Sequence, residues 1–205
     1  VAVGGAGLYV RALCEGMDDL PQADESLREE MDRWLAEEGL GALAEKLREL
    51  DPEYYRIVDL NNPARVVRAL EVCLQTGMPY SRQRTGIRRA RPFEIVKIGV
   101  DLPREELYDR INRRVDRMLA DGLEAEARAL YPYRELNALQ TVGYREFFDY
   151  FDGCIGYDEA VELIKRNSRR YAKRQLTWFR RDPEIRWFRP DDDAAMINYI
   201  DFGKS

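Results

Sequence analysis

The segment from Lys165 to Arg181, KRNSRRYAKRQLTWFRR, constrains the fold more than any other stretch of the chain. It holds eight Lys or Arg residues and no Asp or Glu, in a chain whose formal net charge is −5. At about 100° per residue, one helix face collects Arg166, Arg169, Arg170, Lys173, Thr177, Arg180 and Arg181. The opposite side collects Val161, Ile164, Tyr171, Ala172 and Phe179. We therefore predict a long amphipathic helix with one basic face and one face packed on a core.

A basic stripe in an acidic chain indicates an anionic partner, because composition alone does not produce it. Tyr171 and Trp178 lie toward the margins of the basic face, where an aromatic ring could stack on a nucleic-acid base. The alternative is a solvated face whose long side chains cover apolar surface. A basic patch proposes only the class of partner, so both interpretations stay open at this point.

The composition is that of a soluble globular protein. The chain has 205 residues, of which 45% are hydrophobic and 35% charged, which suits one large domain or two small ones with a real core. No apolar run approaches the roughly 18 residues of a membrane span, and no signal peptide is visible. Three widely separated cysteines suit reduced thiols, best interpreted as small core residues. We therefore expect a cytoplasmic protein without membrane association.

Histidine is absent from the chain. This excludes Ser/His and Cys/His nucleophilic pairs and a histidine general base. Catalysis would have to use carboxylates, Arg, Lys, backbone amides or a bound ion.

The first residues, Val1 to Gly5, are typical of the end of a buried strand that runs into a glycine loop. A strand needs neighbours, and no preceding sequence supplies them. We therefore expect the chain to be the downstream part of a longer protein.

Most of the remaining sequence predicts helices. The predicted helices cover Asp24 to about Glu38, Ala42 to Leu50, Asn62 to Gly77, Arg104 to Ala120, Leu123 to Tyr131, Gly143 to Phe151, and Asp158 onward. Residues 93–100, FEIVKIGV, and 185–188, IRWF, predict strands. Residues Ser81 to Arg91 carry five arginines and predict a loop.

The segment VGGAGLYV places glycines at a strand-to-helix junction, where backbone amides and a helix N-terminus can bind an anion. Glycines at such a position are as often needed for the turn itself, and the pattern is neither GxGxxG nor a Walker A loop. At the other end of the chain, Gly203-Lys204-Ser205 resembles the end of a P-loop, but Asn198 stands where the first glycine is required. Asp201-Phe202-Gly203 spells DFG without a kinase catalytic loop upstream, so we discard both.

Two helices carry arginines that project together. Arg65 and Arg68 share a face with Glu71, which suits either an anion site or an exposed charge cluster. Arg110, Arg114 and Arg117 share a face of the helix LYDRINRRVDRML. Converging guanidiniums suit a diphosphate, which they bind bidentately, whereas pairing with Asp109 and Asp116 is the alternative.

The segment from Gln140 to Arg145, QTVGYR, is a polar loop that enters a helix. Its amide, hydroxyl, guanidinium and aromatic ring are groups that can bind the edge of an unstacked base. The alternative is a simple helix N-cap at Thr141.

In this order, the segments resemble the tRNA dimethylallyltransferases, also called tRNA isopentenyltransferases. The segments that carry the resemblance are VGGAGLYVRAL, Asp51-Pro52, NPARVVRALEV-x-L-x-TG, VDLPREELYDRINRRVDRML-x-x-GLEAEARAL, LQTVGYREFFDY and IKRNSRRYAKRQLTWFRRDPEIRWF. They cover nearly the whole chain, and the ordered set is far more specific than any single motif.

The resemblance implies an activity, a fold and partners. Such enzymes transfer a dimethylallyl group from its diphosphate to N6 of an adenosine adjacent to the tRNA anticodon. The implied fold is α/β and predominantly helical in this chain: an incomplete P-loop-NTPase-like core with a helical insertion. The core would include residues 1–20, with the strand end, glycine loop and helix start, and residues 81–205, with the basic helix; the insertion would be residues 21–80. The implied partners are the tRNA anticodon stem–loop and dimethylallyl diphosphate, and we expect a monomer.

The resemblance also implies roles for individual residues. Arg114 would hold the diphosphate leaving group, and the diphosphate loop would be Gly4, Gly5, Ala6 and Gly7. The implied tRNA-binding residues are Arg65, Val66, Val67, Arg68, Gln140, Thr141, Val142, Gly143, Tyr144, Arg145, Lys173, Arg174, Gln175, Leu176, Thr177, Trp178, Phe179 and Arg180. Mg²⁺ is an implied cofactor, with no ligand in this chain.

The chain departs from the family pattern in two ways. The family's phosphate loop, and the Asp-Ser pair that holds the general base, lie upstream of the residues present, so we expect the chain to bind tRNA without catalysing transfer. Ala6 stands where the family usually has Thr or Ser, which removes a hydroxyl from the glycine loop.

Two other hypotheses compete with the enzyme. The first is a non-catalytic RNA-binding module derived from the family. The second is a helical protein-interaction domain, which predicts that charge reversal at Lys173 and Arg174 leaves tRNA affinity unchanged.

Overall fold

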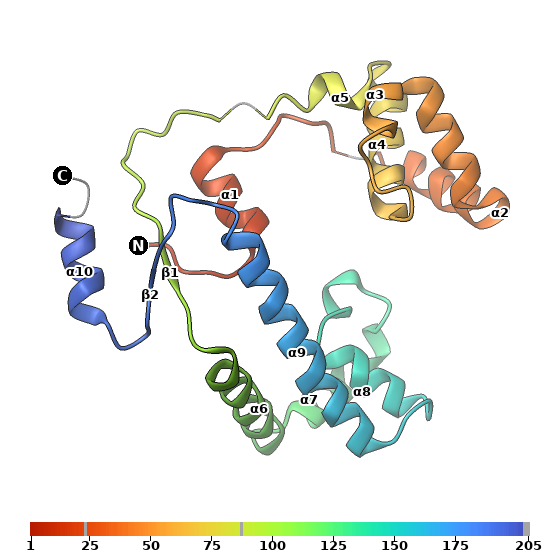
Figure 1. Cartoon of the computed structure of the whole chain (residues 1–205). Coiled ribbons are helices and arrows are strands. Elements are labelled where there is room, and N and C mark those ends of the chain that lie inside the picture. The colour runs from red at the N-terminus through yellow and green to blue at the C-terminus, as the bar shows by residue number, and fades with distance from the viewer. Residues whose placement is uncertain (23, 87, 203–205) are drawn as a thin grey trace. The chain divides into compact units, whose positions relative to one another are not determined.

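The computed structural model describes residues 1–22, 24–86 and 88–202 (Figure 1). The chain divides into two compact units. One unit, which we call the sheet unit, comprises Val1–Val10 and Glu94–Ser205; the other, the helical unit, comprises Arg11–Phe93. The discarded P-loop resemblance at 203–205 and the end of the DFG resemblance lie outside the described residues.

The helical unit contains α2 (Glu25–Leu50), α3 (Pro52–Tyr55), α4 (Pro63–Thr76), α5 (Tyr80–Gln83) and the end of α1 (Gly7–Glu15). The Asp24 carboxylate accepts hydrogen bonds from the backbone N–H groups of Ser26 and Leu27 and caps α2. Gly39, at φ 79°, interrupts this helix, which confirms the predicted break. Asn62 caps α4 and Gly77 ends it in the left-handed region, both as predicted.

The core of the helical unit lies between α2 and α4. Its buried residues are Met31, Leu43, Leu47, Tyr54, Val66, Ala69 and Leu70. Asp51 is 1% exposed and accepts hydrogen bonds from the Tyr54 N–H at 2.9 Å and from the Ser81 N–H and hydroxyl at 2.6 and 2.8 Å. Because a buried carboxylate needs such partners, Asp51 fixes the starts of α3 and α5 together.

In the sheet unit, β1 (Ile98–Val100) and β2 (Arg186–Phe188) pair in parallel, with Ile98 opposite Arg186 and Val100 opposite Phe188 (Figure 1). Its helices are α6 (Arg104–Ala120), α7 (Leu123–Leu130), α8 (Tyr144–Phe151), α9 (Tyr157–Phe179) and α10 (Asp193–Phe202), with 3₁₀ turns at Tyr131–Tyr133 and Asn137–Leu139. The core, between the first half of α9 and α6, α7 and α8, contains Val115, Leu123, Ala127, Phe147, Phe148, Ala160 and Ile164. The predicted class, α/β and predominantly helical, is confirmed: the described residues are mostly helical with a small parallel sheet.

Several expectations from the sequence need correction. The strand predicted over residues 93–100 forms only at Ile98–Val100, the residues that pair with β2. Residues 1–5 form no strand, and Val1 and Val3 are fully exposed rather than buried. A strand requires a hydrogen-bonding neighbour along its length, and β2 supplies one for three residues only.

Besides the four-residue α3, two helices were not predicted. The short helix α5 lies at the start of the segment expected to be a loop, where Asp51 holds Ser81. The other is α10, which is apolar on several sides and so lacks the periodicity of an amphipathic helix. Cys73 is buried, as expected of a core residue, but Cys154 is exposed. Among the described residues, no helix is both long and apolar enough to cross a membrane.

Candidate active site

The glycine loop, which we define as Gly4 to Gly7, lies directly against the last turns of α9. The Gly5 carbonyl oxygen accepts a hydrogen bond from Gln175 Nε2 at 2.8 Å. A Cβ atom at Gly5 would lie 2.2 Å from Gln175 Nε2, and one at Gly7 would lie 2.2 Å from Trp178 Nε1. Both glycines have φ angles that any residue can adopt. Close approach of α9, rather than backbone conformation, therefore favours glycine at these two positions.

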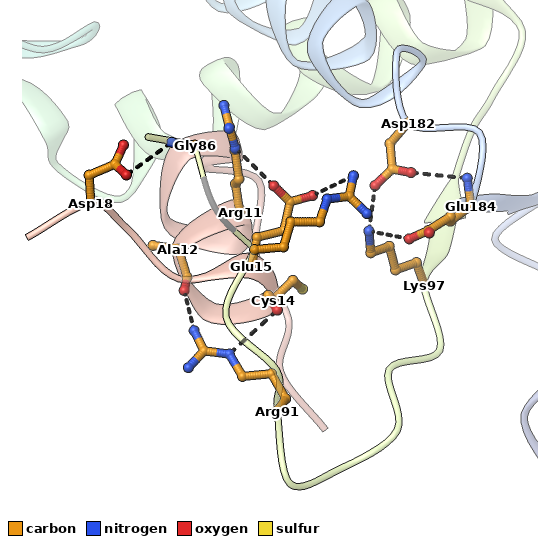
Figure 2. Close-up of polar contacts among 11 residues, drawn as sticks. Arg11, Ala12, Cys14, Glu15, Asp18, Gly86, Arg91, Lys97, Asp182 and Glu184 are labelled. Atoms are coloured by element: carbon orange, nitrogen blue, oxygen red, sulfur yellow. Dashed lines mark hydrogen bonds and ion pairs between the residues drawn. The ribbon is translucent and has the colours of Figure 1, made fainter. Parts of the chain in front are cut away.

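Ion pairs fix the end of α9 to the sheet. Arg180 pairs with Asp101, which follows β1. Lys97 precedes β1 and pairs with Asp182 and Glu184 (Figure 2). Both N–O distances are 2.7 Å. Burial acts to lower the pKa of Lys97, but the hydrogen bonds to both carboxylates outweigh it and raise that pKa. The charge on Lys97 is therefore stabilised in the folded protein.

The cations of α9 fall into two groups, those that pack the helix on α6 and those exposed to solvent. Toward the start of the predicted basic segment, Lys165 pairs with Asp116 at 2.7 Å and Arg169 donates to Asn112 at 2.6 Å, so both are used to pack α9 on α6. Other cations on α9 are exposed and form no ion pair with any described residue; these are Arg166, Arg170, Lys173, Arg174 and, just after the helix, Arg181. Positive charge near the end of α9 is therefore largely available to an external anion.

Two aromatic rings accompany these exposed cations. Tyr171 is 46% exposed and Trp178 is 41% exposed, which agrees with a position at the margins of the face; the grouping of Tyr171 with the residues packed on the core is wrong. The Arg174 guanidinium lies 5.6 Å from the centre of the Tyr171 ring. The opposite side of α9 carries buried Ile164 and half-buried Ala172, as predicted. The end of α9 thus presents both charge and stacking surface to solvent.

A buried glutamate holds the QTVGYR segment against α9. Glu146 is 5% exposed; its carboxylate accepts from the Gly143 N–H at 2.8 Å and from Asn167 Nδ2 at 2.7 Å. Gly143, at φ 106°, is the N-cap of α8, so the alternative of a cap at Thr141 is wrong. Sequence reasoning missed Glu146 and Asn167, although a Glu three residues after an N-cap is a known capping pattern.

The side chains of the QTVGYR segment have different environments. Thr141 and Arg145 are exposed, and Val142 packs against the core. Gln140 Nε2 donates to the Arg134 carbonyl at 2.7 Å. The Tyr144 hydroxyl donates to Glu126, and this hydrogen bond raises the pKa of Tyr144. Gln140 is exposed too, so Arg145 and Thr141 are the exposed residues of the segment whose side chains form no hydrogen bond among the described residues.

Arg114 lies on the exposed side of α6. The side of α6 that faces α9 carries Asn112 and Asp116, and Arg114 follows Asn112 by about 200° around the helix. Within the described residues Arg114 forms no ion pair, and no hydrogen bond joins it to the glycine loop. Arg113 instead uses Asp109, at 2.6 Å. Arg114 is therefore a free guanidinium outside the contact between the loop and α9.

The arginine motif of α4 belongs to the helical unit. Arg68 pairs with Glu71 at 3.2 Å and also donates to the Pro21 carbonyl, while Arg28 pairs with Glu71 at 3.3 Å. Arg68 and Glu71 thus pair as in the alternative, but the cluster is not the exposed one expected, because Glu71 is 1% exposed. Val66 is buried in the core and Val67 is half-buried. Arg65 is the exposed guanidinium of the motif.

A family model described as IPP transferase matches residues 1–182. The chain belongs to the IPP transferase family. Its similar proteins include the tRNA dimethylallyltransferase of Cytophaga hutchinsonii, 53% identical over 98% of this chain and 66% of that protein. The tRNA dimethylallyltransferase 1 of Phocaeicola vulgatus is 52% identical over 98% of this chain and 67% of that protein. The chain thus spans about two thirds of the length of these IPP transferase relatives.

Solved structures agree with this assignment. The tRNA isopentenylpyrophosphate transferase of Bacillus halodurans is 40% identical, with a TM-score of 0.58 over 96% of this chain and 62% of that one. A eukaryotic dimethylallyltransferase acting on tRNA has a TM-score of 0.72 at 22% identity, over 96% of this chain and 54% of that one. The second likeness shows the shared fold. The fold and family expected from the sequence motifs are therefore confirmed.

Proposed function

We propose that the protein carrying this chain transfers a dimethylallyl group from dimethylallyl diphosphate to N6 of the adenosine adjacent to the anticodon of tRNA. Membership of the IPP transferase family supports this, as do curated relatives named tRNA dimethylallyltransferase. The structural observation that carries the proposal is the contact between the glycine loop and the exposed basic end of α9. It brings a candidate diphosphate-binding loop next to a candidate RNA-binding surface.

In this proposal the end of α9 binds tRNA. Lys173 and Arg174 contact phosphates, and Tyr171 and Trp178 offer rings on which bases stack. Moving the target adenosine out of its stack costs roughly a few kcal/mol, which these contacts offset. The exposed groups Arg145 and Thr141 of the QTVGYR segment, and Arg65 on α4, are proposed to contact the anticodon stem–loop as well.

The chemical step replaces a C–O bond of the dimethylallyl diphosphate with a C–N bond to adenosine. The diphosphate leaves with the bonding electron pair, so negative charge grows on its oxygens. Backbone N–H groups of the glycine loop are proposed to stabilise that charge. The resemblance adds the Arg114 guanidinium, which lies outside the contact between the loop and α9. The resemblance assigns the base that takes the N6 proton to an Asp that this sequence does not include.

The resemblance also implies Mg²⁺ as a cofactor. Among the described residues, no group of three or more His, Cys, Asp or Glu side chains is placed to hold a metal ion. The proposal therefore gives the residues of this chain no role in binding Mg²⁺. We also propose that the protein acts as a monomer in the cytoplasm.

A transfer assay tests the proposal. The protein that carries this chain, rather than the chain alone, is incubated with labelled dimethylallyl diphosphate and an unmodified tRNA anticodon stem–loop, beside a stem–loop whose target adenosine is replaced by guanosine. The proposal predicts label in the first RNA and none in the second. Tight RNA binding without transfer would instead favour the non-catalytic RNA-binding module.

A further inference from the structure

Gln175 lies within the segment of α9 expected to contact RNA, yet its amide group is used elsewhere. Its Nε2 donates to the Gly5 carbonyl, 170 residues away in sequence, and the side chain is half-buried while neighbouring Arg174 is exposed. Three residues further along the same helix, the indole of Trp178 covers the Cα of Gly7. Two side chains one turn apart thus fix the glycine loop from one side.

The hydrogen bond to Gly5 also determines the direction of the next backbone donor. The Gly5 carbonyl and the Ala6 N–H belong to the same planar trans peptide, so they point in opposite directions. Because the carbonyl points toward Gln175, the Ala6 N–H points away from it. No hydrogen bond of the Ala6 N–H is seen within the described residues, whereas the Ala6 carbonyl accepts from Val10 at the start of α1.

We propose that Gln175 is a positioning residue, which orients the Ala6 N–H toward the diphosphate by holding the Gly5 carbonyl. The inference rests on the proposed function and extends it to a residue otherwise assigned to RNA contact. Without the Gln175 amide, the peptide between Gly5 and Ala6 is free to rotate. The flanking glycine makes such rotation easy, since glycine accepts a wide range of backbone angles. The N–H would then be lost as a preorganised donor.

The first experiment compares Gln175→Glu and Gln175→Leu in the transfer assay. At neutral pH neither substituted side chain donates a hydrogen bond, so we expect kcat to fall by roughly three- to tenfold, the factor for one hydrogen bond, with an unchanged KM for RNA. In acid, the carboxyl group introduced by Gln175→Glu becomes protonated and regains an O–H donor. The kcat of Gln175→Glu relative to wild type should therefore rise as the pH falls toward the ordinary glutamate pKa of about 4.3, while that of Gln175→Leu stays low.

A double-mutant cycle tests the contact directly. Gly5→Ala meets no backbone obstacle and clashes only with the Gln175 amide. We expect Gly5→Ala to reduce kcat in the wild-type background and to cost much less in a Gln175→Ala background. Equal losses in both backgrounds would overturn the inference. So would a loss confined to RNA affinity, because that result would make Gln175 a direct RNA contact.

An NMR measurement does not depend on transfer. Inorganic pyrophosphate is titrated into the ¹⁵N-labelled chain, and we expect the Ala6 amide resonance to shift, with a several-fold weaker apparent affinity in Gln175→Leu. The Gly143 amide serves as an internal reference, since it is committed to Glu146. No shift at Ala6, or the same titration in both proteins, would overturn the positioning role. If the NMR result overturns the positioning role but the wild-type protein transfers the dimethylallyl group, the proposed function still stands. If the Ala6 shift depends on Gln175 but no transfer occurs, the proposed activity is refuted and the positioning role is not.

Discussion

Glu146 gives the sharpest stability prediction because both of its carboxylate oxygens accept hydrogen bonds in a buried position. Gly143 and Asn167 are the donors, at 2.8 and 2.7 Å, and the residue is 5% exposed. A hydrogen bond to a charged group contributes about 1.5–3 kcal/mol. In Glu146→Gln one oxygen becomes an NH₂ group facing another donor, so we expect a loss of about 1.5–3 kcal/mol in the free energy of unfolding. Glu146→Ala removes both hydrogen bonds and should lower the free energy of unfolding by about 3–5 kcal/mol. The loss is not larger because Asn167 is half-buried and can form a hydrogen bond with water instead.

The assay is urea unfolding combined with amide hydrogen exchange at Gly143. The matched control is Glu124→Gln, which removes a carboxylate paired with Arg128 at the surface of α7 at 2.9 Å. An exposed i,i+4 pair contributes about 0.3–0.5 kcal/mol, so the control should change stability little and leave exchange at Gly143 slow. If Glu146→Gln costs no more than the control, or if Gly143 stays protected in Glu146→Ala, the assignment of Glu146 as a structural acceptor is refuted.

Three further predictions address the core, the sheet and the glycine loop. Phe147 is fully buried, so Phe147→Ala should lower the free energy of unfolding by about 3–5 kcal/mol in a thermal unfolding experiment. The control Tyr133→Ala changes an exposed residue and should alter stability by less than about 0.5 kcal/mol. Equal effects of the two substitutions would contradict the placement of the core. The folded-state pKa of Lys97 is raised, so wild type should be more stable to unfolding than Lys97→Met, by the full amount below the ordinary pKa of 10.5. This difference in free energy of unfolding should decline as the pH rises through the folded-state pKa. A difference that instead grows above pH 10.5 would contradict the sign of the shift. Ala6→Thr should raise turnover in the transfer assay by restoring the hydroxyl that the family usually has, and unchanged turnover would remove that side chain from the mechanism.

The elements predicted correctly are those whose ends are encoded locally. Asp24, Asn62 and Gly77 begin and end helices through contacts with residues no more than four positions away, so the sequence pattern alone locates them. The predicted extent of β1 was wrong, because pairing with β2, nearly ninety residues downstream, decides which residues form the strand. Local propensity carries no information on that pairing.

The sequence predicted the segments of the candidate site but not the contacts between them. The basic face of α9 follows from periodicity, but the use of Lys165 and Arg169 in packing on α6 depends on the tertiary fold. The family resemblance assigned Gln175 to RNA binding, and only the structure shows its amide on Gly5. The pairing of Arg68 with Glu71 could be foreseen as an alternative, because residues three apart on a helix are adjacent.

Binding of an unmodified anticodon stem–loop as a function of salt tests most directly whether the end of α9 binds RNA. The Lys173→Glu, Arg174→Glu double variant is compared with Lys46→Glu, Arg48→Glu, which changes net charge equally on the surface of α2. Each phosphate contact on single-stranded RNA contributes about −0.7 to the slope of log K against log salt, so the α9 variant should bind more weakly and lose at least about 1.4 from the steepness of that slope. The α2 variant should match wild type. Equal affinity and slope in all three proteins would contradict an RNA-binding role for α9 and favour the protein-interaction alternative.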